Sequence, residues 1–186
     1  MVRTHRAGIL VLAASAVLGL GLAPAHAASA SKINTNVSAA LKKLYAANPS
    51  AKLLADNAKG VLVFPGILKA GFIFGAQGGD GALRKGGKTV GYYRTLAASY
   101  GFQAGVQSFG YALFFMTDSA LAYPDKTNGW EIGTGPSIVI VDKGMAKSLS
   151  TTTLKNDVYA FIFDQKGLMA GIGIQGSKIT RIHPGK

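Results

Sequence analysis

The amino-acid sequence predicts an α+β domain in which N-terminal helices pack on a β-rich antiparallel sheet or partly closed barrel of about eight short strands. Two observations carry this prediction. An amphipathic helical pattern comes first in the chain, and short apolar runs interrupted by glycine then recur from residue 61 to residue 182. The links between these runs are too short for crossover helices, so neighbouring strands should be antiparallel.

Residues 1–27 have the three parts of a signal peptide. Arg3 and Arg6 precede an apolar run over residues 9–22, and Ala25-His26-Ala27 has the small-x-small pattern of a cleavage site. The apolar run is shorter than the roughly 20 residues that a membrane-spanning helix needs. We therefore expect a single domain over residues 28–186 that is exported, periplasmic or secreted, and peripheral to a membrane.

Composition narrows the function classes. The chain has no cysteine, which excludes disulfides, thiolate nucleophiles and thiolate metal sites. Without Arg3 and Arg6 it has 18 Lys and Arg against 8 Asp and Glu. This excess favours phospholipid headgroups, acidic polysaccharide or nucleic acid, of which nucleic acid is the least accessible after export. Alternatively, the lysines only keep the protein soluble.

Two helices are expected before the strands. Ile33, Val37, Ala40, Leu41 and Leu44 form an apolar stripe that predicts an amphipathic helix over residues 31–47. A second helix over residues 49–59 should follow, with capping residue Asn48 before it, Pro49 at its first position and a left-handed Gly60 at its end.

The strands are expected in a fixed order. Residues 61–64 should form a strand that ends at a Pro65-Gly66 corner, because proline is unfavourable in a central ladder. Residues 67–76 should lead into hairpin turns at residues 78–81 and 85–88. Further strands are expected at residues 82–84, 89–97, 100–107, 111–117, 130–133, 137–142, 158–163, 168–174 and 178–182. A helical turn capped by Asp118 should cover residues 118–122, residues 146–156 should be a polar connection, and a turn should follow at residues 164–167.

No motif predicts catalysis or a cofactor. Residues 171–176 match GxGxxG but are not followed by the helix and acid of a dinucleotide site. Residues 78–81 resemble a single calcium-binding repeat without the neighbours that complete it. After cleavage, His183 is the only histidine, whereas a zinc site usually has three or four protein ligands. The alternative is a small envelope hydrolase in which two acids, or His183 and a serine, converge in one cleft.

Most aromatic side chains on the predicted strands should lie in the core. Alternatively, Phe72 and Phe74, together with residues 114–116, would line an acyl-chain pocket.

Basic residues near the N-terminus and in the turn at residues 84–88 provide the positive functional signal. An amphipathic helix flanked by lysines can lie in a membrane interface, where each lysine contributes about 1 kcal/mol with anionic lipid. Alternatively, the helix simply covers one face of the sheet, and both hold if the helix can leave that face. The candidate lipid-binding residues are Lys32, Lys42, Lys43, Lys52, Lys59, Lys69, Arg84, Lys85 and Lys88.

Several short blocks of sequence resemble one known family. They are Lys59-Gly60, Phe64-Pro65, Lys69-Ala70-Gly71-Phe72 with Gly75, Gly79-x-Gly81, Tyr100-Gly101-x-Gln103-x-Gly105 and Gly167-Leu168-x-Ala170-Gly171. Their order and spacing resemble the SYLF lipid-binding domain family, in an exported bacterial-type member, from about residue 38 to residue 181.

The resemblance implies an α+β domain with a phospholipid-binding role and no enzymatic activity. In eukaryotic relatives a basic, amphipathic N-terminal region binds phosphoinositides, and some relatives bind actin. Lys32, Lys42 and Lys43 occupy that region here. We therefore expect a module that binds an anionic phospholipid surface, without a cofactor or nucleic acid, with a structural or host-interaction protein that binds another protein as a further alternative.

Overall fold

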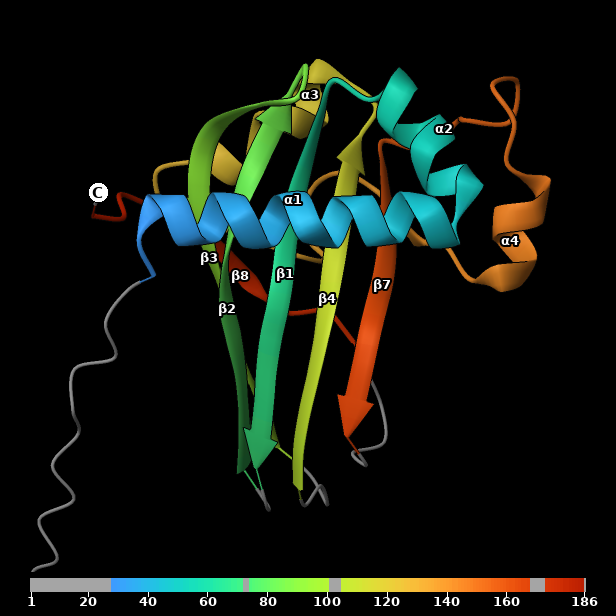
Figure 1. Ribbon diagram of the computed structural model, residues 1–186. Coiled ribbons are helices and arrows are strands. Elements are labelled where there is room, and N and C mark those ends of the chain that lie inside the picture. The colour runs from blue at the N-terminus through green and yellow to red at the C-terminus, as the bar shows by residue number, and fades with distance from the viewer. Residues whose placement is uncertain (1–27, 72–73, 101–104, 168–172, 186) are drawn as a thin grey trace, which may run out of the picture.

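A computed structural model describes residues 28–71, 74–100, 105–167 and 173–185. It confirms the α+β prediction, because helices lie on one curled eight-stranded sheet that forms a half-barrel (Figure 1). The helices are α1 (Ala30–Ala47), α2 (Pro49–Asn57), α3 (Asp118–Leu121) and α4 (Lys143–Ser148), with a 3₁₀ helix η1 (Tyr123–Asp125). The strands are β1 (Gly60–Gly71), β2 (Phe74–Lys85), β3 (Lys88–Tyr100), β4 (Gly105–Phe115), β5 (Trp130–Glu131), β6 (Ile138–Ile140), β7 (Val158–Gly167) and β8 (Lys178–Ile182).

The sheet has the strand order β5-β8-β3-β2-β1-β4-β7-β6. Helix α1 crosses β2, β1, β4 and β7 on the outer face of the sheet, about halfway along the strands (Figure 1). The strands continue beyond α1 toward the end where the β1–β2 connection lies. Helix α1 therefore divides the outer face into a covered part and a part beyond the helix.

The two faces of the sheet carry separate hydrophobic layers where α1 covers it. Leu62 and Phe64 of β1 belong to the inner layer, which also contains Trp130 and Tyr111. Their neighbours in the strand point to the outer layer, which is completed by the apolar stripe of α1, namely Ile33, Val37, Ala40 and Leu44. Four residues of the predicted stripe are thus buried, each 5% exposed or less, whereas the fifth, Leu41, is only partly buried against this layer.

The second helix is shorter than predicted. It begins at Pro49 as expected, but Asn48 makes no capping hydrogen bond with its side chain. It ends at Asn57 with an extended Ala58, and Gly60 is the first residue of β1. The prediction of a left-handed Gly60 was wrong, because the chain enters the sheet directly and does not close a helical cap.

Strand β1 passes through the predicted Pro65-Gly66 corner. Its pairing with β2 shifts register between Val63 and Leu68, and its pairing with β4 shifts between Phe64 and Ile67. The corner is therefore a β-bulge, which places an extra residue in one strand and lets proline avoid the regular ladder.

Residues 78–81 are not a hairpin turn but part of β2. A Cβ atom on Gly81 would lie 2.2 Å from the Val63 carbonyl oxygen, and one on Gly79 would lie 2.4 Å from that of Gly66. These glycines allow the backbones of β1 and β2 to approach closely beside the bulge. Tight turns also require glycine, so the sequence alone does not distinguish the two roles. The second predicted turn is confirmed, with positive φ angles of 54° at Gly86 and 78° at Gly87.

Four other local predictions need correction. Strand β6 pairs with β7 in parallel, unlike the antiparallel pairs elsewhere in the described sheet. The connection at residues 146–156 includes the end of α4. Thr117, not Asp118, accepts the capping bond of α3, and β7 continues through the predicted turn at residues 164–167. The predicted strands at 100–107 and 168–174 fall partly on residues 101–104 and 168–172, outside the described residues.

Among the helices of the described chain, none combines the length and apolar character needed to cross a membrane.

Candidate functional site

Helix α1 turns its lysines to solvent. Lys32, Lys42 and Lys43 are exposed, while the apolar side of the same helix is packed on the sheet. Lys43 lies 3.5 Å from Asp164, in a pair whose side chains are 70% and 44% exposed. Such an exposed pair contributes little energy, so it leaves the lysine available to another anion.

Arg84 holds α1 on the sheet. Its guanidinium donates hydrogen bonds to the Asn34 carbonyl at 3.2 Å and to the Ser38 hydroxyl at 2.9 Å, and it also bonds the Gly87 carbonyl. Asn34 in turn bonds Tyr92 and Thr89 of β3. Arg84 therefore fixes the helix, and we leave it out of the proposed lipid contacts.

The other candidate residues fall into two groups. Lys52, Lys59, Lys85 and Lys88 are exposed, with Lys52 paired to Asp56 one helical turn away. Lys69 is only 7% exposed, on the inner side of β1. Lys69 is therefore the one buried lysine among the candidate residues, whereas these four lysines lie on the surface.

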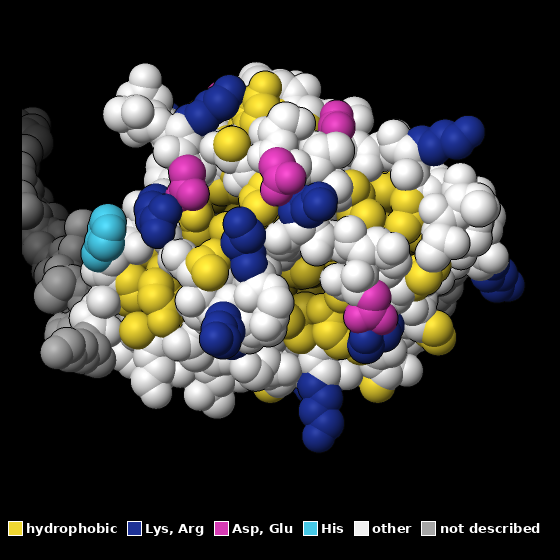
Figure 2. All heavy atoms as spheres, turned by 90° about the horizontal axis from the view of Figure 1, so that it is seen from above, with side chains coloured by type: hydrophobic (Ala, Val, Ile, Leu, Met, Phe, Trp, Pro, Cys, Tyr) yellow, Lys and Arg dark blue, Asp and Glu magenta, His cyan; other side chains and the backbone are white. Residues whose placement is uncertain are grey.

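Charges of both signs share the end of the molecule opposite the β1–β2 connection. Figure 2, seen from above, shows Lys and Arg side chains interspersed with Asp and Glu and with apolar groups. The basic excess therefore does not form a single continuous patch on that end.

Several acids of the described chain bond separate partners. Asp80 accepts two hydrogen bonds from Arg94 at 2.6 and 3.0 Å, and Asp142 caps α4. The hydrogen bond and charge of Asp80 raise the pKa of the Arg94 guanidinium, which burial opposes. Asp142 and Asp164 line one pocket, and Asp118 and Asp125 line another, but Asp142, Asp164 and Asp125 each accept a hydrogen bond from another residue.

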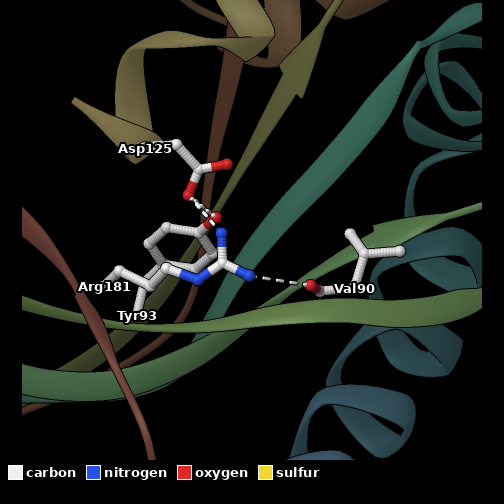
Figure 3. Close-up of polar contacts among 4 residues, drawn as sticks. All are labelled: Val90, Tyr93, Asp125 and Arg181. Carbon is white, nitrogen blue, oxygen red and sulfur yellow. Dashed lines mark hydrogen bonds and ion pairs between the residues drawn. The ribbon is translucent and has the colours of Figure 1, made fainter.

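Asp125 joins three elements (Figure 3). Tyr93 donates its hydroxyl to Asp125 at 2.6 Å, Arg181 donates to the same oxygen at 2.8 Å, and Arg181 also bonds the Val90 carbonyl. Burial, together with the bond to Asp125, raises the pKa of Tyr93 well above its ordinary value of 10. The group ties η1 to β3 and β8 and is a structural anchor.

The described residues contain no group of three or more His, Cys, Asp or Glu arranged to hold a metal ion. His183 is exposed beside β3 and β8, in a shallow depression that it shares with Tyr92 and Arg181.

A cavity of about 530 Å³ lies between the C-terminal end of α1 and strands β6 and β7. Leu44, Phe161 and Phe163 line it, together with the paired Lys43 and Asp164. An apolar lining beside a lysine suits a small amphiphile.

The described residues of the alternative acyl-chain pocket do not line a common pocket. Phe114 and Phe115 are 0% exposed and belong to opposite core layers, in agreement with the core interpretation. Phe74 is 75% exposed, so that interpretation was wrong for this residue, and Phe72 lies outside the described residues. Leu68, Leu96 and Val106 are also exposed, and no functional role was predicted for them. The sequence signal that could have indicated this apolar face is the alternation in β1, where Leu68 and Ala70 point to the side opposite Lys69.

Part of the second half of the chain is similar to a known family. Residues 96–183 match the model of the Ysc84 family, also called the SYLF domain, described as Las17-binding protein actin regulator. The matched range runs from within β3 to the end of β8 and contains two of the sequence blocks noted above, those beginning at Tyr100 and Gly167. No curated protein matches the chain.

Proposed function

The chain is a member of the SYLF family, by its match over residues 96–183, and we propose that it is a non-enzymatic module that attaches to anionic phospholipid surfaces. The family is linked to lipid binding and to actin-related binding, which supports a binding role rather than a catalytic one. The observation that carries the anionic preference is the exposed lysine side of α1, formed by Lys32, Lys42 and Lys43.

Attachment begins with electrostatic attraction. Lysines held near an anionic surface each contribute about 1 kcal/mol, and the attraction decays within a Debye length of about 8 Å at physiological salt. The apolar side of α1 is buried, so the packed helix approaches lipid through its lysines only. Insertion of that apolar side requires α1 to leave the sheet and to break the Arg84 contacts.

The proposal includes the cellular setting. The pattern of residues 1–27 supports export, which would put the protein in the periplasm or secreted space, peripheral to a membrane.

Vesicle co-sedimentation tests the electrostatic attachment. We expect binding to vesicles of phosphatidylcholine and phosphatidylglycerol (3:1) at low salt, with weaker binding to pure phosphatidylcholine and a decrease as salt rises. Equal binding to both vesicle types, or no binding at low salt, would contradict the proposal.

Charge reversal tests the location of the contact. Lys42→Glu combined with Lys43→Glu should weaken binding to anionic vesicles at least tenfold, because two charges change sign and the net charge beside the membrane falls by four units. The control is Lys147→Glu with Lys155→Glu, which makes the same change in net charge at exposed positions in and after α4. Equal effects of the two double variants would show that net charge alone matters and that α1 is the wrong place.

A tether tests whether α1 must leave the sheet. The side chains of Asn34 and Thr89 are joined by a 2.7 Å hydrogen bond across α1 and β3. Because the chain has no cysteine, Asn34→Cys with Thr89→Cys can be cross-linked specifically by a short bis-methanethiosulfonate reagent. Unchanged vesicle binding after cross-linking would indicate attachment with α1 packed, whereas reversible loss would indicate that α1 detaches.

A further inference from the structure

An apolar surface lies on the outer face of the sheet beyond α1. Four of the seven exposed large hydrophobic residues in the described ranges belong to it, with exposures of 58% for Leu68, 75% for Phe74, 55% for Leu96 and 61% for Val106. Alanines that are also exposed lie between them. We call this set the outer apolar surface: Leu68, Ala70, Phe74, Ala76, Leu96, Ala98 and Val106.

The strand register puts these residues on one face. Residues directly opposite each other in an antiparallel pair point to the same side. Leu68 is opposite Gly78, which is opposite Leu96, and Ala70 is opposite both Ala76 and Val106. Ala76 is in turn opposite Ala98. The surface is therefore continuous across β3, β2, β1 and β4.

This face is the one that α1 covers further along the strands. Ala82 of β2 and Ala112 of β4 pack in the layer under α1. The even-numbered residues that follow them toward the β1–β2 connection, Ala76 and Val106, point the same way. In Figure 1 these parts of the strands extend beyond α1, and no described element covers them.

The interior of the sheet at the same level is polar. Lys69, Thr95, Gln107 and Ser177 are each 7% exposed or less. Thr95 accepts a hydrogen bond from the Tyr111 hydroxyl at 2.8 Å, and Gln77 donates to Ser177 at 3.2 Å. The usual arrangement of a soluble sheet, with polar groups outside and apolar groups inside, is thus reversed in this part of the molecule.

Charged residues border the outer apolar surface. On the side toward α1 the Asp80–Arg94 pair spans β2 and β3. On the flanks, the exposed Lys166 of β7 lies opposite Ser108, and the exposed Lys178 of β8 lies opposite Leu96. Glu131 is one strand further out, on β5.

We propose that the outer apolar surface inserts into the acyl region of one membrane leaflet while Lys166 and Lys178 meet anionic headgroups. This rests on the proposed lipid-binding function and adds a second contact, independent of α1. The surface crosses four strands that lie about 4.8 Å apart, or roughly 14 Å in all, which suits shallow insertion of this face into the headgroup and outer acyl layers of one leaflet.

Lipid fits this surface better than a second copy of the chain does. In a two-fold dimer through this face the same residues meet on both sides, so the flanking lysines of the two copies would approach each other. Anionic headgroups instead complement lysines that flank an apolar centre, and the long lysine side chains can extend to the headgroup level while the apolar groups enter the leaflet.

The experiment uses polar substitutions on the intact protein. Leu96→Ser with Val106→Ser should weaken partitioning into 3:1 phosphatidylcholine/phosphatidylglycerol vesicles roughly tenfold. About half of each apolar side chain is exposed, and its favourable free energy of transfer from water into the acyl region would be lost. The loss should persist in 0.5 M NaCl, where lysine contacts are screened. Val90→Ser with Met145→Ser is the matched control, since these residues are 44% and 36% exposed elsewhere.

A fluorescent label gives a second readout that does not depend on the stability of the serine variants. Val106→Cys labelled with a nitrobenzoxadiazole dye should shift to the blue on vesicle binding and be quenched by lipids spin-labelled on their acyl chains. The same label at Val90→Cys should do neither.

The outcomes separate this inference from the proposed function. If the wild-type protein binds vesicles, the Leu96 and Val106 variant binds equally, and the Val106 label is not quenched, the inference is overturned and the proposed function stands. Absence of wild-type binding to any vesicle overturns both. A dimer in light scattering that Leu96→Ser with Val106→Ser converts to a monomer assigns the surface to a second copy and overturns the inference.

Discussion

Single glycines decide how close neighbouring strands approach in this sheet. The positions of Gly79 and Gly81 could be predicted as special from the sequence, but their role could not. A positive φ angle and a close backbone contact both require glycine, and only the paired strand distinguishes them.

Alanine substitutions measure this close approach. Gly81→Ala should lower the free energy of unfolding by about 2 kcal/mol, because the new methyl would overlap the Val63 carbonyl and Phe64. Gly66→Ala is the control, since a Cβ at that position has nothing within 4 Å. Urea denaturation of both variants is the measurement, and equal stabilities would contradict the assigned role of Gly81.

Tyr93 should make stability depend on alkaline pH. Its pKa is higher in the folded protein than its ordinary value of 10, so its contribution is fully present below that pH. The contribution is lost as the pH rises above 10 toward the folded-state pKa, because the unfolded chain releases the proton first. Denaturant midpoints between about pH 9 and pH 11 should therefore fall more steeply for the wild type than for Tyr93→Phe. The buried Tyr111, whose pKa is also raised, remains in both proteins as a shared background.

Helix α1 shows what sequence periodicity can and cannot establish about an element. Its apolar stripe predicted the helix correctly and identified its four buried residues, with Leu41 only partly buried. The same stripe serves equally to cover a sheet or to enter a membrane, because both environments select apolar residues on one side of a helix. The Arg84 contacts, which join residues about 50 positions apart, are what assign the stripe to the sheet.

Removing Arg84 should loosen this element. Arg84→Gln should cost about 1–2 kcal/mol of unfolding free energy, because it removes hydrogen bonds from a charged donor to α1. Lys85→Gln, at the exposed neighbouring position, should change it by less than about 0.5 kcal/mol. Thermal denaturation followed by circular dichroism compares the two, and a larger loss for Lys85→Gln would refute the tether.

Across the whole molecule, the bulge at Pro65-Gly66 explains most of what sequence reasoning missed in the candidate site. One extra residue in β1 exchanges which side chains face inward along the rest of the strand. Without it, Lys69 would continue the outward series of Val61 and Val63, and Leu68 would point inside. The sequence identified Pro65 and Gly66 as an interruption of the strand. A corner and a bulge use the same residue types, and only the pairing of β1 with β2 and β4 distinguishes them.

The two hydrophobic layers should make the molecule unfold as one unit. Every central strand contributes to both layers, so α1 and the inner core lose their support together. Trp130, the single tryptophan, is 1% exposed in the inner layer and reports on it by fluorescence, whereas far-ultraviolet circular dichroism reports on the helices. The two urea transitions should coincide, and loss of helix signal at lower urea would mean that α1 separates before the sheet unfolds.

The short edge strands of the sheet affect whether neighbouring copies of the protein can pair edge to edge. The described sheet ends in β5, with two residues, and β6, with three. Strands this short offer few unpaired backbone groups as a template for another chain, which is a common protection against edge-to-edge aggregation. Molecules concentrated on a lipid surface should therefore not pair through β5 or β6, although residues 161–167 of β7 have no partner among the described strands on the side of β6.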